Sequence, residues 1–201
     1  MKRAGILLMV VVVVVLAIGF VAVSVLHNGV SAKATPTPLE VMMARKARHM
    51  AIPKEARGLE NPVKATPENL REGMLHFADH CAICHGNDGS CDTMMGSGLY
   101  PKPPDLRKSE TQDLTDGELF WVIENGVRFT GMPAFSTHDS TPADSWKLVL
   151  FIRHLPQLTA AEKVEMEQYN PKGPEDRDEE KAEDDFLNGA TAAPAEAHHK
   201  H

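Results

Sequence analysis

The feature that most constrains this chain is an uninterrupted apolar run near its start. From Ala4 to Leu26 no residue is charged, and only two glycines and one serine interrupt the apolar side chains. About 23 residues at roughly 1.5 Å each give a helix of about 34 Å, long enough to cross the hydrocarbon core of a bilayer. We therefore expect residues 4–26 to be a transmembrane anchor.

The charges beside this run predict its orientation. Lys2 and Arg3 lie on the short side, so the positive-inside rule places residues 1–3 in the cytoplasm and the rest of the chain on the outer face of the membrane. The alternative is a signal peptide cleaved after Ala32. Signal peptides have apolar regions of only about 7 to 15 residues, so the length favours a retained anchor.

Both flanks of the outer region lack the pattern of a folded core. Residues 27–65 are expected to be linker and lead-in, with a proline-rich spacer (KATPTP) before the stretch 39–50. This stretch could form a turn or two of basic amphipathic helix near the membrane surface, but we favour a solvated lead-in. Residues 171–201 contain nine acidic and four basic residues, a balance of −5 out of −7 for the chain. This composition predicts a disordered, acidic tail with a histidine-rich end.

Between these flanks, four threonines predict the starts of helices. Each is followed by an acidic side chain at the second or third position, and two by proline at the first, which are N-cap signals. They predict helices at 67–81, 116–125, 142–155 and 160–169. No segment shows sustained strand alternation. The sequence therefore predicts an all-α fold, with a main domain at 66–158 and an appended helix at 159–170. About 30 loop residues between the first two helices suggest that the loop wraps a ligand.

The sequence CAICH, residues 81–85, admits three chemistries. A thioredoxin-like dithiol would follow a strand, but here a predicted helix leads into Cys81. A zinc site needs four ligands, and no second paired knuckle accompanies Cys81, Cys84, Cys91 and His85. Covalent haem attachment fits the spacing, because two thiols in one turn can each add to a vinyl group while His85 is held beneath the ring. Cys91 is then left over, and the sequence does not distinguish a free thiol, a site of lipidation or dimer formation, and a small buried residue.

A second iron ligand is available in the segment NGVRFTGMPAF. Met132 lies between Gly131 and Pro133, so a stiff loop would present its thioether at a fixed distance. Met94 and Met95 compete, but they follow His85 too closely in sequence to cross the ring edge. Cys81, Cys84, His85 and Met132 are the predicted haem-binding residues, with His85 and Met132 binding the iron.

With these residues in view, the segment from about Met42 to Gln168 resembles class I monohaem c-type cytochromes of the bacterial, membrane-anchored kind. The resemblance rests on CAICH, PKPPDL, LTDGELFWVIENG and GMPAF in this order, and on Gly73, Phe77 and Cys81 at intervals of four. It implies a helical domain wrapped around one covalent haem c, with Gly73 at a close crossing of the first and last helices.

The resemblance also implies roles for further residues. A carbonyl in the Pro101 to Pro104 loop would accept a hydrogen bond from the second nitrogen of His85. Tyr100, Trp121 and Arg128 are candidates for holding the haem propionates, although each could simply be a packing residue or a solvated charge.

Ligation by histidine and methionine fills both axial positions of the iron, which favours electron transfer over catalysis. We expect a membrane-anchored carrier, or the cytochrome subunit of a respiratory electron-transfer complex, in a bacterial inner membrane with its cytochrome domain in the periplasm. Redox proteins or respiratory subunits would be its partners. The acidic balance argues against nucleic acid, and no small-molecule substrate is expected.

Two alternatives belong to other functional classes. A haem enzyme or gas sensor would require Met132 to leave the iron. A metal-handling protein would use His198, His199 and His201 at the end of the tail.

Overall fold

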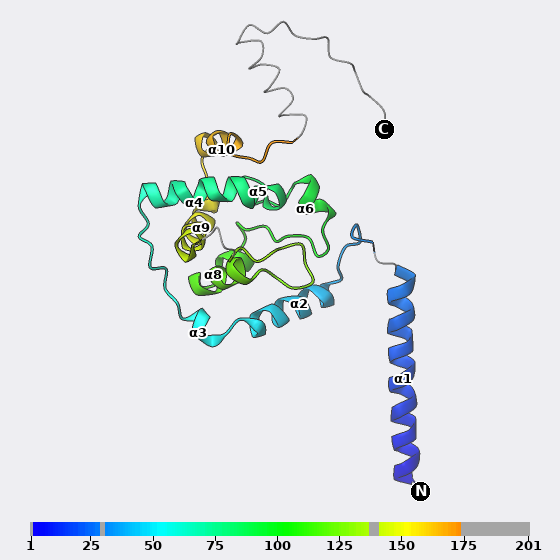
Figure 1. The fold of residues 1–201 in the computed structure, drawn as a ribbon. Helices are drawn as coiled ribbons and strands as arrows, with labels where there is room; N and C mark the ends of the chain where they lie inside the picture. The colour runs from blue at the N-terminus through cyan, green and yellow to red at the C-terminus, as the bar shows by residue number, and fades with distance from the viewer. Residues whose placement is uncertain (1, 29–30, 137–140, 174–201) are drawn as a thin grey trace, which may run out of the picture.

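The computed structural model of the chain describes residues 2–28, 31–136 and 141–173 (Figure 1). Regular structure in these residues is entirely helical, which confirms the predicted fold class. In chain order the elements are α1 (Lys2–Asn28), α2 (Pro38–Ala51), α3 (Lys54–Arg57), α4 (Pro67–His80), α5 (Ala82–His85), α6 (Met94–Gly98), α7 (Ser109–Gln112), α8 (Asp116–Asn125), α9 (Pro142–His154), the 3₁₀ helix η1 (Leu155–Gln157) and α10 (Ala160–Glu167). The histidines predicted to bind metal, in the tail from residue 174 on, lie outside the described residues.

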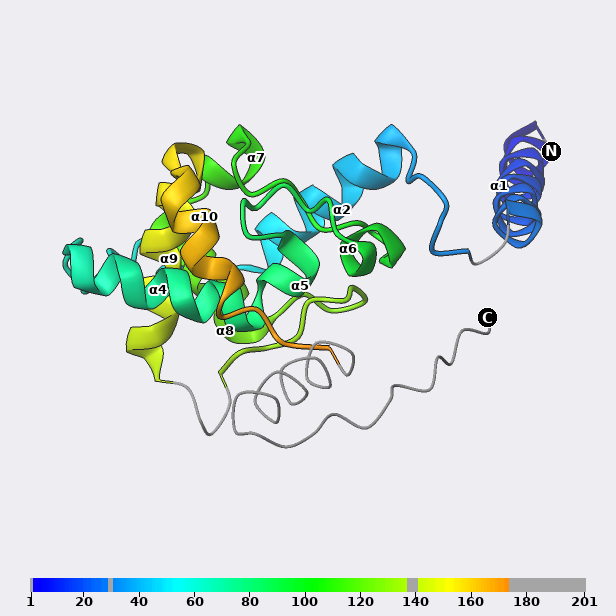
Figure 2. The ribbon, with the colours of Figure 1, turned by 90° about the horizontal axis from the view of Figure 1, so that it is seen from above.

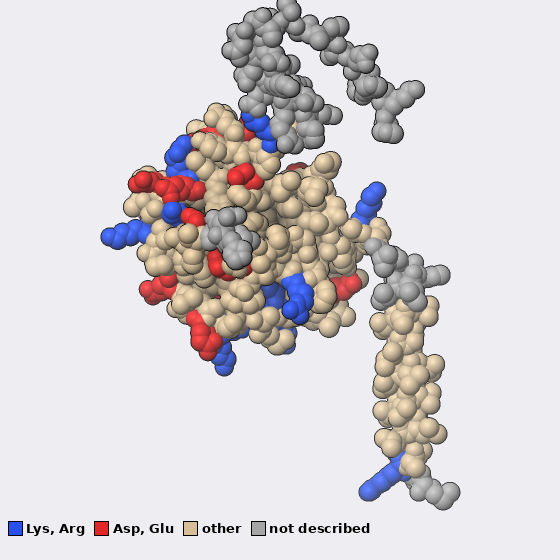
Figure 3. All heavy atoms as spheres, viewed as in Figure 1, with Lys and Arg blue, Asp and Glu red and all other residues tan. Residues whose placement is uncertain are grey.

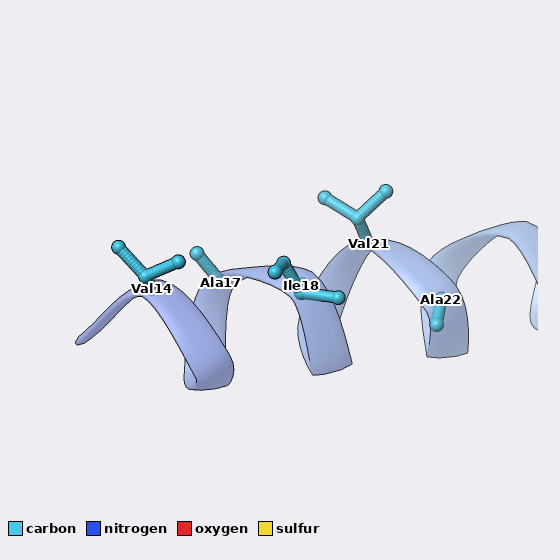
Figure 4. Close-up of a pocket in the computed structure, with 5 residues that line it drawn as sticks. All are labelled: Val14, Ala17, Ile18, Val21 and Ala22. Atoms are coloured by element: carbon cyan, nitrogen blue, oxygen red, sulfur yellow. The ribbon is translucent and has the colours of Figure 1, made fainter. Parts of the chain in front are cut away.

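Helix α1 has the length and composition of a membrane span. Its segment Arg3–Ser24 has a mean hydropathy of 3.4 and none of it is buried against the rest of the chain. Val14, Ala17, Ile18, Val21 and Ala22 form a shallow apolar groove along it (Figure 4). Charged side chains are absent along most of this helix, whereas acids and bases are interspersed on the visible face of the body (Figure 3).

The four predicted N-caps lie where the sequence places them. Thr66, Thr115, Thr141 and Thr159 precede α4, α8, α9 and α10, so the predicted starts are confirmed. At α8 the Thr115 hydroxyl accepts from the Glu118 N–H at 3.2 Å, and the Glu118 carboxylate accepts from the Thr115 N–H at 2.9 Å. These bonds satisfy backbone donors that a helix end leaves free.

The centre of the body is the crossing of α4 with α9. A Cβ atom at Gly73 would lie 2.2 Å from the carbonyl oxygen of Lys147, so only glycine permits this approach. Phe77 and Phe151, both fully buried, meet beside the crossing with ring centroids 5.1 Å apart. The expected close crossing of these helices is confirmed.

Helix α8 packs on the next face of α9. The ring of Phe120 stacks on Trp146 with centroids 4.1 Å apart and an interplanar angle of 7°. Leu119 and Ile123 of α8 are buried in the same core. The three helices therefore form the frame on which the intervening loops are held (Figure 2).

For residues 39–50 the sequence favoured a solvated lead-in over a turn or two of amphipathic helix. Helix α2 occupies this stretch and begins with a capping box of Thr37 and Glu40. None of its residues is buried, but polar side chains contact the body: Arg45 forms an ion pair with Glu110 at 2.5 Å, and His49 Nδ1 lies 3.1 Å from the buried Glu118 carboxylate. The C-cap residue Ile52 is fully buried and anchors the end of α2, while polar contacts hold its exposed turns.

Helix α10 packs across α4. Met166 is fully buried, and Arg71 of α4 donates to Glu165 at 2.7 Å. Lys163 reaches Asp88, in the loop after α5, at 3.3 Å. Burial acts to raise the pKa of Asp88, but hydrogen bonds from Ser90 and the charge of Lys163 outweigh it and lower that pKa to about 2. The division at residue 158 stays a prediction, but α10 contributes to the same core.

The long loop between α4 and α8 is more ordered than the sequence suggests. Beyond α5 it contains α6 and α7, each of four or five residues. Arg153 of α9 fixes its far end by donating to the Gln112 carbonyl at 2.5 Å and to the Leu114 carbonyl. Its Nε also donates to Asp116 at 2.9 Å.

Candidate functional site

The two cysteines of CAICH lie on one turn at the end of α4. The Cys81 N–H donates to Phe77 as the last bond of α4, and the His85 N–H donates to the Cys81 carbonyl at 2.9 Å to form α5. Neither Cys81 nor Cys84 is in a disulfide. Burial raises the pKa of Cys81 to about 12, so this thiol stays protonated at neutral pH. Two thiols are thus presented side by side from a rigid turn.

The imidazole of His85 is neutral and half-buried. Burial lowers its pKa to about 4, which leaves a lone pair available for a metal at neutral pH. Its ring lies near Phe77, with centroids 6.4 Å apart. Its Nδ1 lies 3.4 Å from the sulfur of Cys91, whereas its Nε2 makes no hydrogen bond within the described part of the chain. Nε2 is therefore the atom free to bind iron.

The loop after His85 folds back over the motif. The Thr93 hydroxyl donates to the Ile83 carbonyl at 2.9 Å, and the Leu106 N–H donates to the Gly89 carbonyl at 2.9 Å. A Cβ atom at Gly96 would lie 2.4 Å from the Cys84 carbonyl oxygen. The contacts of Thr93 and Gly96 hold α5 against the following loop, which the bond between Leu106 and Gly89 closes.

Cys91 occupies the position expected for a direct bond between His85 and the proline loop. Its sulfur lies 2.7 Å from the Pro104 carbonyl oxygen as well as 3.4 Å from His85 Nδ1. The thiol therefore stands between the two groups that the family resemblance pairs directly. The sequence left the role of Cys91 open, because this contact depends on the path of the loop.

Met132 lies in a hairpin closed onto the end of α8. Val127 donates to the Met132 carbonyl at 3.1 Å, and Phe135 donates to the Ile123 carbonyl at 3.1 Å. Gly126 turns the chain with φ +63°, and a Cβ there would lie 2.7 Å from the Met132 carbonyl oxygen. The sequence signal Asn125-Gly126 thus positions the methionine loop.

Leu99 links the methionine loop to the CAICH side. A Cβ at Gly131 would lie 2.6 Å from a methyl of Leu99, which directly follows α6. Helix α6 in turn packs on Cys84 through Gly96. The structure brings the two loops together and leaves Met132 half-buried.

The competing methionines differ in environment. Met94 and Met95, on α6, are 88% and 47% exposed. Among the propionate candidates, Tyr100 donates to Glu40 of α2 at 3.3 Å, Trp121 is half-buried and Arg128 is exposed. Their roles stay predictions.

Phe129 is an exposed aromatic residue that the sequence did not single out. It is 92% exposed and takes a left-handed backbone conformation, φ +62°, three residues before Met132. The segment GVRFTG carries no signal for this, because a phenylalanine is rarely found at positive φ.

The donors fit a covalently attached haem. Two adjacent thiols suit two vinyl groups, a neutral imidazole with free Nε2 suits iron, and a thioether on a fixed loop is a soft ligand of the kind that raises iron potentials. Ile83, Met95 and Phe129, in α5, in α6 and in the loop before Met132, are exposed apolar side chains.

Residues 68–152 match the family model described as "Cytochrome C oxidase, cbb3-type, subunit III". The match begins in α4, ends in α9 and includes all four predicted haem-binding residues. No curated protein matches the chain.

Proposed function

Because residues 68–152 form a c-type cytochrome domain, which implies covalently bound haem c with its iron, we propose that this chain carries single electrons through a haem held by Cys81, Cys84, His85 and Met132. The bound haem supplies a one-electron iron couple. The observation that carries the proposal is the placement of both thiols and the free Nε2 of His85 on one turn.

The two cysteines would bind the haem covalently. Each thiol adds its sulfur and its hydrogen across one vinyl double bond, so a thioether forms and nothing is released. Because Cys81 ends α4 and Cys84 lies within α5, both sulfurs are fixed by the helix frame. The attachment therefore fixes the site to the core through two covalent bonds.

The axial ligands would exclude substrate. His85 would hold the iron through Nε2 and Met132 through its sulfur, which would leave no iron position for a substrate. A methionine ligand raises the reduction potential. Rigid loops limit how far either ligand moves between oxidation states, which suits electron transfer and not bond-making chemistry.

The chain would hold this domain near a membrane. Residues 29–37, between α1 and α2, span at most about 31 Å at roughly 3.4 Å per residue. Such a tether raises the effective concentration of the domain near membrane complexes. We place α1 in a bacterial inner membrane with Lys2 and Arg3 in the cytoplasm, and the cytochrome domain in the periplasm.

The partners would be membrane redox proteins. The matched family is described as an oxidase subunit, so we propose a carrier or cytochrome subunit that passes electrons to a respiratory complex. Isolation of the membrane-bound chain with its co-purifying subunits tests this assignment. If the chain is recovered without any redox protein, the proposal that it is a subunit of a respiratory complex is contradicted.

Spectra of the purified holoprotein test the ligands. We expect haem to stay with the polypeptide in acid acetone, and the oxidised protein to show the methionine-to-iron charge-transfer band. Met132→Ala should lose this band and bind carbon monoxide. Met94→Ala and Met95→Ala are matched controls that should keep the band. A wild-type protein that lacks the band and binds carbon monoxide readily would favour an enzyme or gas sensor instead.

A further inference from the structure

The side chain of Cys91 bridges two groups on the proximal side of the proposed haem site. Its sulfur lies 3.4 Å from Nδ1 of His85 and 2.7 Å from the carbonyl oxygen of Pro104. A third contact, to the Gly89 carbonyl, is longer at 3.7 Å. The thiol is half-buried between these groups.

The directions of these hydrogen bonds follow from which atoms carry hydrogens. If Nε2 of His85 binds iron, the single hydrogen of the neutral ring is on Nδ1, which must donate. A carbonyl only accepts, so the thiol hydrogen goes to Pro104. The sulfur lone pair is then left to accept from His85. Each donor has one acceptor in this relay.

We propose that Cys91 is a positioning residue for the haem-binding histidine, and that its sulfur accepts the Nδ1 hydrogen of His85 while its own hydrogen is donated to Pro104. The inference rests on the proposed role of His85 as iron ligand. It adds a determinant of the reduction potential that is independent of Met132.

The backbone, not the thiol, aims this side chain. Cys91 takes a left-handed conformation, φ +65°, and its N–H donates to the His85 carbonyl at 2.8 Å. The bond between Leu106 and Gly89 closes the same loop. A change confined to the Cys91 side chain therefore leaves the supports of the loop intact.

The acceptor strength sets how strongly His85 donates to iron. A hydrogen bond to Nδ1–H makes the imidazole more basic, and a more basic ligand stabilises oxidised iron. Thiol sulfur is a weak acceptor. With the Cys91 sulfur as acceptor, the reduction potential is therefore higher than it would be with an oxygen acceptor at Nδ1. It is lower than it would be with no acceptor there.

The test is the reduction potential of the membrane-extracted, full-length holoprotein. Cys91→Ser, which puts oxygen in place of sulfur, should lower the equilibrium constant for reduction about threefold, which is about 28 mV at 59 mV per tenfold for one electron. Cys91→Ala should raise that constant by a similar factor. Ser97→Ala, at an exposed position in α6, is the control and should change nothing.

Shifts of both Cys91 variants in the same direction, or none beyond the control, would overturn the proposal. The charge-transfer band of the methionine ligand should persist in both. Its loss from the wild type would instead contradict the Met132 assignment.

An infrared measurement needs no variant. The chain has three cysteines, and two become thioethers, so Cys91 is the only thiol of the holoprotein. Its S–H stretching band should shift between the reduced and oxidised states, because the charge on iron changes the acidity of the His85 Nδ1 hydrogen. A band that is identical in both states would refute the contact.

Discussion

Replacing Gly73 with alanine should destabilise the protein through a single steric overlap. The added Cβ would lie 2.2 Å from the Lys147 carbonyl oxygen and 2.7 Å from its carbon. Ordinary Cβ contacts begin more than 3 Å away, so α4 and α9 must separate by about 1 Å. Both helices are packed on Phe77 and Phe151, so this separation loosens the central core.

The magnitude follows from two opposing effects. Overpacking a core costs about 1–3 kcal/mol, and a backbone carbonyl cannot move aside as a flexible side chain can, so we take about 3 kcal/mol for Gly73→Ala. Alanine favours a helix interior over glycine by about 1 kcal/mol. We therefore expect the free energy of unfolding to fall by about 2 kcal/mol. With a urea slope of about 2 kcal/mol/M, the midpoint falls by about 1 M.

Urea unfolding of the oxidised holoprotein measures this change, with the Soret absorbance showing that haem is present. Gly98→Ala is the matched control, because a Cβ there has open space within 4 Å. The control should be neutral or more stable by about 0.5 kcal/mol. Equal midpoints for the two variants would refute the argument that backbone contact at Gly73 limits the crossing.

Three further changes test other parts of the structure. Met166→Ala should lower the free energy of unfolding by about 2–4 kcal/mol, because the side chain is fully buried. The control Val164→Ala, at a 59% exposed position, should change it by less than about 0.5 kcal/mol in the same urea assay. Arg153→Lys should lower the free energy of unfolding by about 1–2 kcal/mol, since lysine keeps the charge but not the forked donors that hold two carbonyls. An unchanged thermal unfolding midpoint would contradict this prediction. Folding lowers the pKa of Asp88, so the stability that its carboxylate contributes is complete above about pH 4 and is lost as pH falls toward 2. Asp88→Asn should remove this contribution to the acid dependence of unfolding, which is at most about 1 kcal/mol after solvent screening. The control Asp92→Asn should keep it.

The sequence predicted the parts of the fold that local chemistry decides. The bonds of a capping box close within one turn, so the starts of α8 and α10 could be predicted without any tertiary information. The same capping box stands at Thr37 and Glu40, before α2. This local signal accounts for a helix of nearly four turns where the apolar pattern indicated at most one or two, because α2 has no buried apolar face.

The short helices could not be predicted in this way. Helix α6 has five residues, too few to be stable alone, and it exists because Gly96 packs against the Cys84 carbonyl. The position of Cys91 could not be predicted from local sequence either. Its contact with His85 depends on a left-handed backbone that no residue preference would assign to cysteine.

Stability and redox tuning should depend on different residues. The crossing at Gly73 supports the core from one side of α4, whereas Cys91 acts on His85 through a loop whose backbone bonds do not involve the thiol. If this separation holds, Gly73→Ala lowers the urea midpoint and leaves the potential unchanged, while Cys91→Ser shifts the potential and leaves the midpoint unchanged. A variant that moved both quantities together would mean that the geometry around His85 is set by the helix crossing itself, and that the loop after the motif follows the core instead of holding the ligand independently.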